Sequence, residues 1–538
     1  MIDLKSLKFR PTKKEMMKVL VIDRNSLSGG LIPDYSSTHP VSVEGGNNQY
    51  SKATGITFWR SGHLNRIAPA ELYGAIADPN NYLQTNAPLN GMVASTGSAY
   101  FILDNARLIL LSLGTGGTIS DYYDVAFATT HSGHTTPSGE DLILIKAADG
   151  NEYILWSWND NTDGDVSITG TGANFKDAGH TNFNWFSGLT SSGVLTKGVP
   201  HKMIHKTIFN DIYILNGQYV ATVQLSGSAT PPGGTGNPTR LNLGQGWIAN
   251  SICDYGNYIA IVGYQKAGYY GGYSEGVSRT VSRMWLWDGY SDNPNYVFDI
   301  PDNYVSRIVN DNGTLKVFTQ GRNATTKIMQ FNGNGFDIIN ESTNIGSAPY
   351  HDAVDIYQGM VNWASSSNIY CLEKTALHNR QVAKDTLGNT ISTVTLLKNL
   401  YGDRFYIGGA GKLWVMNYNY LSNASLTTKL FQIPENSTIT KIVVRIAQLG
   451  TGASFKLGLF DNYGSGSIGF SDDKLNWQID SDVSQDYGTS IITAKQPVFI
   501  PDITNFFVVL QFNHTNSGIL AAVISAVEIY YEITDKQY

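Results

Sequence analysis

The chain has 538 residues, of which 42% are hydrophobic, 12% aromatic and only 15% charged. This inventory can bury a sizeable core, which excludes wholesale disorder. The formal net charge of −7 argues against a general nucleic-acid-binding protein, because such a protein needs a basic face. The 55 glycines and 31 tyrosines, without long Glu/Lys-rich amphipathic patterns, predict an all-β protein rich in turns.

The N-terminal region carries positive charge but no export signal. Residues 1–25 hold seven Lys or Arg against three Asp or Glu, a local charge of +4 (7 − 3). Two interpretations stay open, an arm that docks on an acidic neighbour or a solvated tail with one strand at 19–22. No apolar run is typical of a secretory signal or reaches the roughly 20 residues that span a bilayer. We therefore expect neither export nor a membrane span, and Cys253 and Cys371 fit a reducing cytoplasm.

Residues 27–57 are rich in Gly, Ser, Pro and Asn, so we assign residues 1–57 to an N-terminal arm and an extended lead-in. Glycine pairs at 29–30 and 45–46 are predicted to turn the chain, because no helix pattern follows that would complete a phosphate-binding loop. A repeat array is predicted to begin near residue 58. Residues 70–77 are predicted to form a short helix or turn.

A long polar insertion of the array lies at 160–200. Asp160, Asp163 and Asp165 resemble part of a calcium loop. The closing Glu and the following helix of such a loop are missing, which favours an ordinary polar loop of a blade.

Two pairs of histidines have spacings seen in zinc sites. His131 and His134 form one pair, and His201 and His205 the other, but no third ligand is near either pair in sequence. Surface histidines are the favoured explanation, and we expect no metal and no cofactor.

Two pairs of tryptophans, at 156/158 and 285/287, each place both rings on one face of a strand. Core packing between repeats is the favoured explanation, with a sugar-binding platform as the alternative.

A Gly- and Tyr-rich loop at 268–276 is the candidate contact surface. It presents Tyr269, Tyr270 and Tyr273 on a flexible stem, and such rings bury area at low entropic cost. The loop therefore suits contact with a glycan or a protein, while packing between subunits is an equal alternative.

Two stretches have the pattern of a four-stranded antiparallel meander. In 305–339, apolar strands meet at Asn-Asp-Asn-Gly (310–313) and at Asn-Gly-Asn-Gly (332–335). These are strong hairpin signals, because Gly and Asn tolerate positive φ. Residues 251–300 repeat the pattern with a longer central loop. A meander of this size is typical of one β-propeller blade, and it cannot bury both faces alone.

Turns assigned to the first hairpin of each copy set the number of copies. Their second members are at residues 105, 150, 211, 256, 313, 359 and 411, at intervals of 45, 61, 45, 57, 46 and 52. These intervals lie near the roughly 40–50-residue period of propeller repeats, with surplus length in loops. The sequence therefore predicts a β-propeller of about seven blades over residues 58–421.

Beyond residue 421 the period stops, and strand-like runs become unevenly spaced. Six to eight antiparallel strands in about 110 residues fit a β-sandwich of the jelly-roll type. We therefore predict a C-terminal β-sandwich at 422–538.

Three features together resemble virion structural proteins of tailed bacteriophages, in which a propeller is joined to a small β-sandwich. They are the extended start VLVIDRNSLSGGLIP, the irregular blades at 252–300 and 305–339, and the closing domain from TTKLFQIPENSTITKIVVRIA. The resemblance covers the whole chain as architecture. No catalytic or binding motif is matched, so no functional residues are carried over.

The resemblance implies a non-enzymatic structural component of a phage virion, in the tail or another appendage, made in the host cytoplasm. Its expected partners are other virion proteins and further copies of this chain in a homo-oligomer, with no direct contact to nucleic acid. One alternative is a glycan-binding module for host attachment, and another is a propeller glycan hydrolase. For the hydrolase, the Asp-box-like stretch at 471–477 lacks the glycine of such a box, and we expect no catalytic residues.

Overall fold

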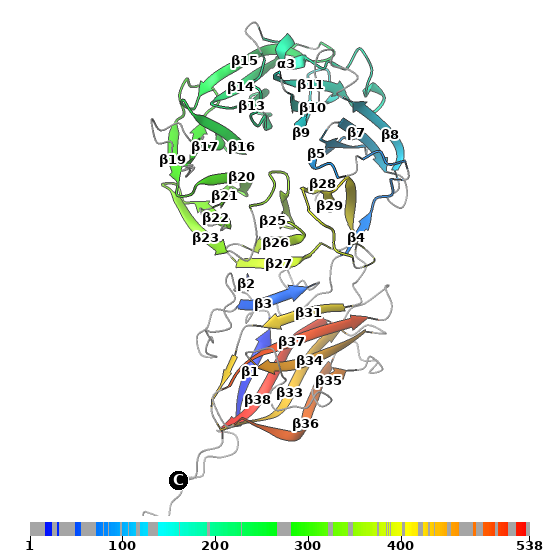
Figure 1. The fold of residues 1–538 in the computed structure, drawn as a ribbon, viewed down its shortest axis with the longest axis vertical. Coiled ribbons are helices and arrows are strands. Elements are labelled where there is room, and N and C mark those ends of the chain that lie inside the picture. The colour runs from blue at the N-terminus through cyan, green and yellow to red at the C-terminus, as the bar shows by residue number, and fades with distance from the viewer. Residues whose placement is uncertain are drawn as a thin grey trace, which may run out of the picture.

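The structure is a computed structural model of the chain, and Figure 1 shows two bodies, a ring of small sheets and a two-sheet sandwich beside it. The described residues are 17–23, 30–31, 49–54, 72–78, 80–83, 86–96, 99–105, 107–113, 119–126, 138–160, 162–190, 194–227, 229–265, 281–320, 326–342, 348–373, 376–383, 385, 387, 389–400, 404–417, 423–428, 431–434, 436–448, 453–461, 477–479, 488–500, 504–514 and 523–533. Within them, helical structure is limited to 172–174 and α3 (Trp185–Gly188), which confirms the all-β prediction.

Around the ring, the described residues form seven antiparallel sheets, six with four strands and one with three. In six of these sheets, neighbouring strands follow in chain order, with the first strand innermost and the last at the outer rim. The sheets consist of β5 (Leu89–Ala94), β6 (Ala99–Asp104), β7 (Arg107–Leu113) and β8 (Ile119–Ala126); β9 (Ser138–Lys146), β10 (Glu152–Asn159) and β11 (Gly164–Gly170); β12 (Met203–Lys206), β13 (Asp211–Asn216), β14 (Tyr219–Ser226) and β15 (Gly233–Asn242); β16 (Trp247–Tyr255), β17 (Tyr258–Gln265), β18 (Ser282–Trp287) and β19 (Tyr296–Ile300); β20 (Tyr304–Asp311), β21 (Thr314–Gln320), β22 (Thr326–Phe331) and β23 (Phe336–Ser342); β24 (Val354–Tyr357), β25 (Met360–Ser365), β26 (Asn368–Glu373) and β27 (Ala376–Val382); and β28 (Leu396–Leu400), β29 (Arg404–Gly409), β30 (Lys412–Asn417) and β4 (Leu72–Ala75).

The two stretches predicted to be meanders, 251–300 and 305–339, are the sheets β16–β19 and β20–β23. Between β20 and β21, Asn312 and Gly313 have φ values of 51° and 88°. Both central residues of this turn lie in the left-handed region, which is the requirement that makes Asn-Gly a hairpin signal. The hairpin predictions in these two sheets are confirmed.

Five of the seven predicted turns join the first and second strands of a sheet, as expected. The turns at 104–105 and 410–411 instead join the second and third strands, between β6 and β7 and between β29 and β30. The first hairpins of those two sheets connect through Ser-Thr-Gly-Ser (95–98) and Tyr-Gly-Asp (401–403). These connections contain Gly-Ser and Gly-Asp, which are hairpin signals as well, so each of these sheets offers two turns and the later one was taken as the first hairpin.

The insertion predicted as a polar loop at 160–200 is partly regular structure. It contains β11 and α3, and Trp185 and Phe186 of α3 are buried in the core between the second and third sheets. Single bridges join β11 to the later part of the insertion, at Ile168–Asn182 and at Gly164–Leu195. The insertion thus covers the open side of the three-stranded sheet, which has no fourth strand among the described residues.

The last sheet is completed by a strand from before the first sheet. β4 pairs antiparallel with β30, with Gly74 opposite Val415. The prediction of a short helix or turn at 70–77 is therefore wrong, because pairing with β30 decides the conformation of a stretch whose local sequence does not. The next residue, Ile76, donates its backbone N–H to Leu413 O at 2.9 Å and is buried in the adjacent core.

Both tryptophan pairs are buried between neighbouring sheets, which confirms core packing as their role. Trp156 and Trp158 of β10 pack against the first sheet. Trp285 and Trp287 of β18 pack towards the third sheet, where Trp287 meets Tyr213 edge-on with ring centroids 5.6 Å apart.

The sandwich consists of two sheets. One has the order β1-β38-β33-β36, with β1 (Met17–Asp23), β38 (Val523–Ile533), β33 (Ser437–Gln448) and β36 (Gly488–Ile500). The other has the order β2-β3-β31-β37-β34-β35, with β32 also paired to β37; its strands are β2 (Gly30–Leu31), β3 (Gln49–Thr54), β31 (Asn423–Thr428), β37 (Thr504–His514), β34 (Ala453–Asp461), β35 (Trp477–Ile479) and β32 (Phe431–Ile433). If β1, β31 and β33–β38 are numbered 1 to 8 along the chain, the two sheets contain the orders 1-8-3-6 and 2-7-4-5.

The strands β1, β2 and β3 come from the segment predicted to be an arm and lead-in, yet all three lie in the sandwich. The expected strand at 19–22 is present as part of β1, and Leu20 and Ile22 are buried there. β3 and β31 are antiparallel neighbours, with Thr54 opposite Ser425. The ring, residues 72–417, is therefore inserted between two paired strands of the sandwich, an arrangement that no local pattern reveals.

Candidate functional site

Charged side chains meet where the innermost strands of the ring converge. Lys202, just before β12, donates hydrogen bonds from Nζ to Asp352 Oδ2 at 3.0 Å and to the backbone oxygen of Glu140 at 2.5 Å. Asp352 precedes β24 and lies 150 residues further along the chain. These contacts connect the second, third and sixth sheets across the ring. We call Glu140, Asp141, Lys202, Arg307, His351 and Asp352 the central cluster.

Asp141 and Lys202 of the central cluster are buried, its other members are half-buried, and opposite charges face each other within it. Burial works against the charge of Lys202, but the carboxylates of Asp352, Asp141 and Glu140 outweigh it and raise the pKa of the ammonium group. Burial likewise works against the charge of Asp352, but Lys202 and His351 hold the pKa of this carboxyl well below its usual value. Breaking a buried pair of this kind by removing one partner typically costs about 3–5 kcal/mol, because an uncompensated charge is left behind. The cluster therefore ties the sheets together only as a complete set.

Asp141 behaves differently from Asp352 within the same cluster. Burial raises the pKa of Asp141 to about 6, and the nearby Asp352 carboxylate acts in the same direction. One Asp141 oxygen accepts the backbone N–H of Met203 at 2.6 Å, and the other accepts its neighbour Leu142 N–H at 2.8 Å. Asp141 thus holds the start of β12 against β9.

Ser251, His351 and Asp352 lie in the order of a hydrolase triad. Ser251 Oγ is 3.1 Å from His351 Nε2, and His351 Nδ1 is 3.0 Å from Asp352 Oδ1. A catalytic serine must also reach a substrate. Ser251 has no exposed surface in this structure, and its Oγ already accepts the backbone N–H of Ile308 at 3.1 Å.

Arg307 binds the same ring nitrogen of His351, Nε2, that would have to take the proton of Ser251. Its guanidinium Nη1 lies 2.5 Å from His351 Nε2, so the partners fit a neutral ring that donates from Nδ1 to Asp352 and accepts at Nε2. Burial, and after it the charge of Arg307, lowers the pKa of His351 to about 3. A general base works best with a pKa near the working pH, so this histidine is suited to holding Arg307 in place and not to activating a serine.

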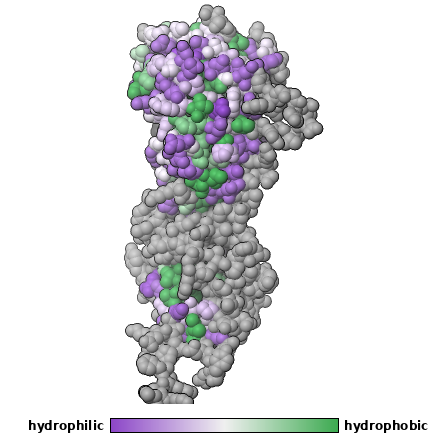
Figure 2. Space-filling view, turned by 90° about the vertical axis from the view of Figure 1, so that its left-hand side faces the viewer, coloured by the Kyte–Doolittle hydropathy of each residue, from purple (hydrophilic) through white to green (hydrophobic). Residues whose placement is uncertain are grey.

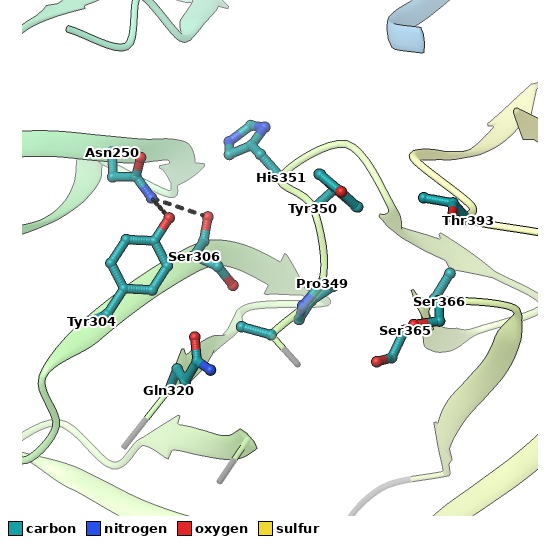
Figure 3. A pocket seen from close by; sticks show the side chains of 12 residues that line it. Asn250, Tyr304, Ser306, Gln320, Pro349, Tyr350, His351, Ser365, Ser366 and Thr393 are labelled. Atoms are coloured by element: carbon teal, nitrogen blue, oxygen red, sulfur yellow. Dashed lines mark hydrogen bonds between the residues drawn. The ribbon is translucent and has the colours of Figure 1, made fainter. Parts of the chain in front are cut away.

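A polar pocket opens beside the central cluster, between the fourth, fifth and sixth sheets. Its volume is about 490 Å³, within the roughly 300–1,000 Å³ range of ligand pockets. Figure 3 shows one side formed by residues of β16, β20 and β21, the other by residues at the end of β25 and before β28, and the segment 349–351 between them. The lining consists of Asn250, Tyr304, Ser306, Gln320, Ala348, Pro349, Tyr350, His351, Ala364, Ser365, Ser366 and Thr393.

Two of the lining residues have backbone conformations that their side chains disfavour. Ser366 and Thr393 have φ values of 54° and 44°, in the left-handed region, where a β-branched residue such as Thr is a rare outlier. Contacts with neighbouring residues hold both conformations in place. Val394 N donates to Ser366 O at 2.8 Å. The backbone oxygen of Thr393 packs so closely on Gly409 that a Cβ atom added to Gly409 would lie 2.2 Å from it. Strained residues of this kind concentrate at functional sites.

The residues singled out in the sequence do not converge on this site. Tyr269, Tyr270 and Tyr273 lie outside the described residues, as do His131 and His134. The undescribed stretch that contains the three tyrosines also has a Gly-x-Ser-x-Gly pattern at 272–276, which the sequence analysis did not identify.

Of the second histidine pair, expected to lie at the surface, His205 is half-buried and His201 is fully buried. His201 is buried, its Nδ1 lies 2.9 Å from Leu215 O, and its Nε2 lies 3.0 Å from Asn159 Oδ1, so both ring nitrogens have protein partners. Burial lowers the pKa of His201 to about 4. In the described part of the chain, no group of three or more His, Cys, Asp or Glu is arranged to hold a metal ion.

The acidic residues compared with a calcium loop have separate structural roles. Asp160 Oδ1 accepts the backbone N–H groups of Thr162 and Asp163 at 2.6 and 2.8 Å, which closes a tight turn. Asp165 is buried on β11, and its Oδ1 accepts Ser187 N of α3 at 3.2 Å.

The central cluster and the pocket were both missed in the sequence. Their members are scattered from 140 to 393, and none belongs to a compact motif. A shared position was the available signal: Glu140, Lys202 and Asp352 each lie within three residues of the start of the first strand of a sheet. Aligning the repeats on their innermost strands would have grouped these charges.

Comparison with protein-family models and with curated proteins yields no match to this chain. Among the residues that the structure describes, no helix is both long and apolar enough to cross a membrane.

Proposed function

We propose that the protein is a non-enzymatic structural component of a bacteriophage virion, in the tail or another appendage. In this proposal, it assembles with other virion proteins and as a homo-oligomer, through surfaces of the ring and the sandwich. The ring is a seven-bladed β-propeller, and the sandwich is of the jelly-roll type.

Strand order supports this description of the two bodies. Closure of the last ring sheet by β4, a strand from before the first sheet, fits a propeller, because it joins the two ends of a circular array. The orders 1-8-3-6 and 2-7-4-5 fit an eight-stranded jelly roll with the ring inserted between its first and second strands.

The central cluster carries the proposal of a structural role. The polar groups at the centre of the ring contact one another: Lys202 pairs with Asp352 at 3.0 Å, and Arg307 bonds to neutral His351 at 2.5 Å. A centre whose polar groups already have partners in the protein stiffens the ring and leaves little there for substrate chemistry. The sequence resemblance to phage structural proteins supports the location in a virion.

An exposed apolar patch on the outer strands supports assembly. Tyr296 and Val297 of β19 are 51% and 47% exposed, and Ile338 of β23 is 51% exposed. Half-buried Phe298 and Phe336 continue the patch through ring contacts with Phe331. Figure 2 faces this side of the ring and shows hydrophobic residues at the surface among polar ones. We call Tyr296, Val297, Phe298, Phe336 and Ile338 the outer-strand patch.

Electron microscopy and light scattering of the purified protein, with immunogold labelling of particles that carry it, test the proposal. We expect a closed multimer and a label confined to one pole of the particle. Ile338→Lys should weaken the multimer, because it places a charge in the outer-strand patch. Val194→Lys is the matched control, since Val194 is 43% exposed in the insertion of the second sheet and does not belong to the patch. A monomer that associates with no particle contradicts the proposal.

A further inference from the structure

The pocket between the fourth, fifth and sixth sheets has a lining without net charge. None of its twelve lining residues is Asp, Glu, Lys or Arg. His351 is the only titratable side chain there with an ordinary pKa near neutrality, and Arg307 together with burial keeps it neutral. A phosphate, a carboxylate or an amine would lose hydration on entering, and no lining side chain carries an opposite charge to compensate, which disfavours charged ligands.

The same lining has polar side chains without hydrogen-bond partners among the described residues. Gln320, Tyr350, Ser366 and Thr393 make no side-chain hydrogen bond to any residue in the described part of the chain. They present an amide, a phenol and two aliphatic hydroxyls, so they can both donate and accept. An apolar ligand would leave these groups unpaired and is therefore disfavoured.

Other side chains of the pocket are fixed before any ligand enters. Asn250 Nδ2 donates to Val305 O at 2.8 Å and reaches Tyr304 OH at 3.4 Å, as Figure 3 shows in part. The Tyr304 ring contacts Tyr264, with centroids 5.2 Å apart. One wall is thus rigid, while Tyr350, 55% exposed, offers an open aromatic surface at the entrance. Rigid walls reduce the entropy lost on binding.

The strained residues add an independent indication. Glycine or asparagine would adopt the left-handed conformation at 366 and 393 at lower cost, yet both positions carry a hydroxyl side chain that lines the pocket. Strain retained at two neighbouring positions of one pocket indicates that the hydroxyls are used.

We propose that this pocket binds a neutral saccharide. The ring of Tyr350 covers an apolar face of the sugar, and the free amide of Gln320 bonds to sugar hydroxyls. The hydroxyl groups of Ser366 and Thr393 bond to the opposite edge of the sugar. This site goes beyond the structural role and does not require a location in a virion.

Saturation-transfer NMR of the full chain with a panel of saccharides tests the inference. The panel contains neutral mono- and oligosaccharides of glucose, galactose, mannose, rhamnose and N-acetylhexosamines, with sialylated and sulfated oligosaccharides as the anionic arm. We expect transfer to at least one neutral member and weaker or no transfer to the anionic ones. Transfer to no neutral saccharide, or a preference for anionic ones, overturns the proposal.

Two variants then place the binding in the pocket. Tyr350→Ala and Thr393→Gly should each weaken the neutral saccharide about tenfold or more, the loss that corresponds to one stacking or hydrogen-bonding contact. Thr393→Gly also relieves the backbone strain, so its thermal midpoint should not fall, which separates lost binding from lost folding. Ala410→Gly is the matched control, because Ala410 has a φ of 50° on the β29–β30 turn and does not line the pocket. Unchanged affinity in both pocket variants contradicts the assignment.

Discussion

At the scale of single residues, Asp165 shows how burial and hydrogen bonding oppose each other. Its side chain is 2% exposed, and burial raises its pKa to about 6 even though backbone N–H groups of Val166 and Ser187 donate to it. In the unfolded chain an aspartate titrates near 3.9. Below that pH both states are protonated; between about 4 and 6 the unfolded state ionises first, so rising pH favours unfolding.

Asp165→Asn should therefore gain stability relative to the wild type as pH rises. Asn keeps an oxygen acceptor for the two N–H donors but carries no charge. The difference in free energy of unfolding should grow between pH 4 and pH 6 and then level off, by roughly 2–3 kcal/mol at about 1.4 kcal/mol per pKa unit. Urea unfolding at each pH measures it. Asp177→Asn, at an exposed position of the same insertion, controls for the loss of one charge, and a pH-independent difference for Asp165→Asn would contradict the prediction.

The residues of the site were harder to predict than those of the core. Trp156 and Trp285 were assigned correctly, because spacing along one strand is enough to place both rings of a pair on one face. Lys202 and Asp352 pair across 150 residues and three sheets, so their proximity depends on the closed ring as a whole. Backbone strain at Thr393 is likewise set by its contacts and has no signature in the sequence.

At the scale of elements, the sequence was most informative where one hairpin decides the structure. The four strands of β20–β23 follow from Asn-Gly turns and alternating apolar residues alone. β4 has no such local cue, and the insertion after β11 reads as polar although α3 is buried. Both are placed by pairing or packing with residues far away in the chain.

Closure by β4 should make a clear contribution to stability. Ile76 follows β4 directly and is buried against the first and last ring sheets. Ile76→Ala should reduce the free energy of unfolding by about 2–4 kcal/mol, as other large-to-small core substitutions do. The matched Ile208→Ala, at a position 74% exposed, should have little effect. Equal urea midpoints for the two variants would show that the closing strand is not integrated with the ring.

At the scale of the whole molecule, the sandwich is discontinuous in sequence. Its edge strand β1 pairs with β38, and β3 pairs with both β2 and β31, so the C-terminal residues alone lack three of its strands. The predicted boundary near residue 422 marks where the ring ends, but local patterns cannot show that residues 17–54 return to the sandwich.

Residues 423–538 expressed alone should not fold. A chain in which residues 1–54 are joined to 423–538 by a short Gly/Ser linker should fold without the ring, because Thr54 and Ser425 are paired neighbours. Dispersion of amide signals in NMR spectra, together with cooperative thermal unfolding, distinguishes the two chains. Folding of 423–538 by itself would show that β1 and β3 are dispensable.

This threading also determines how the molecule responds to tension. Both described ends of the chain lie in the sandwich, with Met17 opposite Glu532 at the same end of the β1–β38 ladder. A pull between the termini therefore opens that ladder from one end, one residue pair after another. The ring, which the chain enters through β4 and leaves through its partner β30, carries none of this load until the sandwich has come apart.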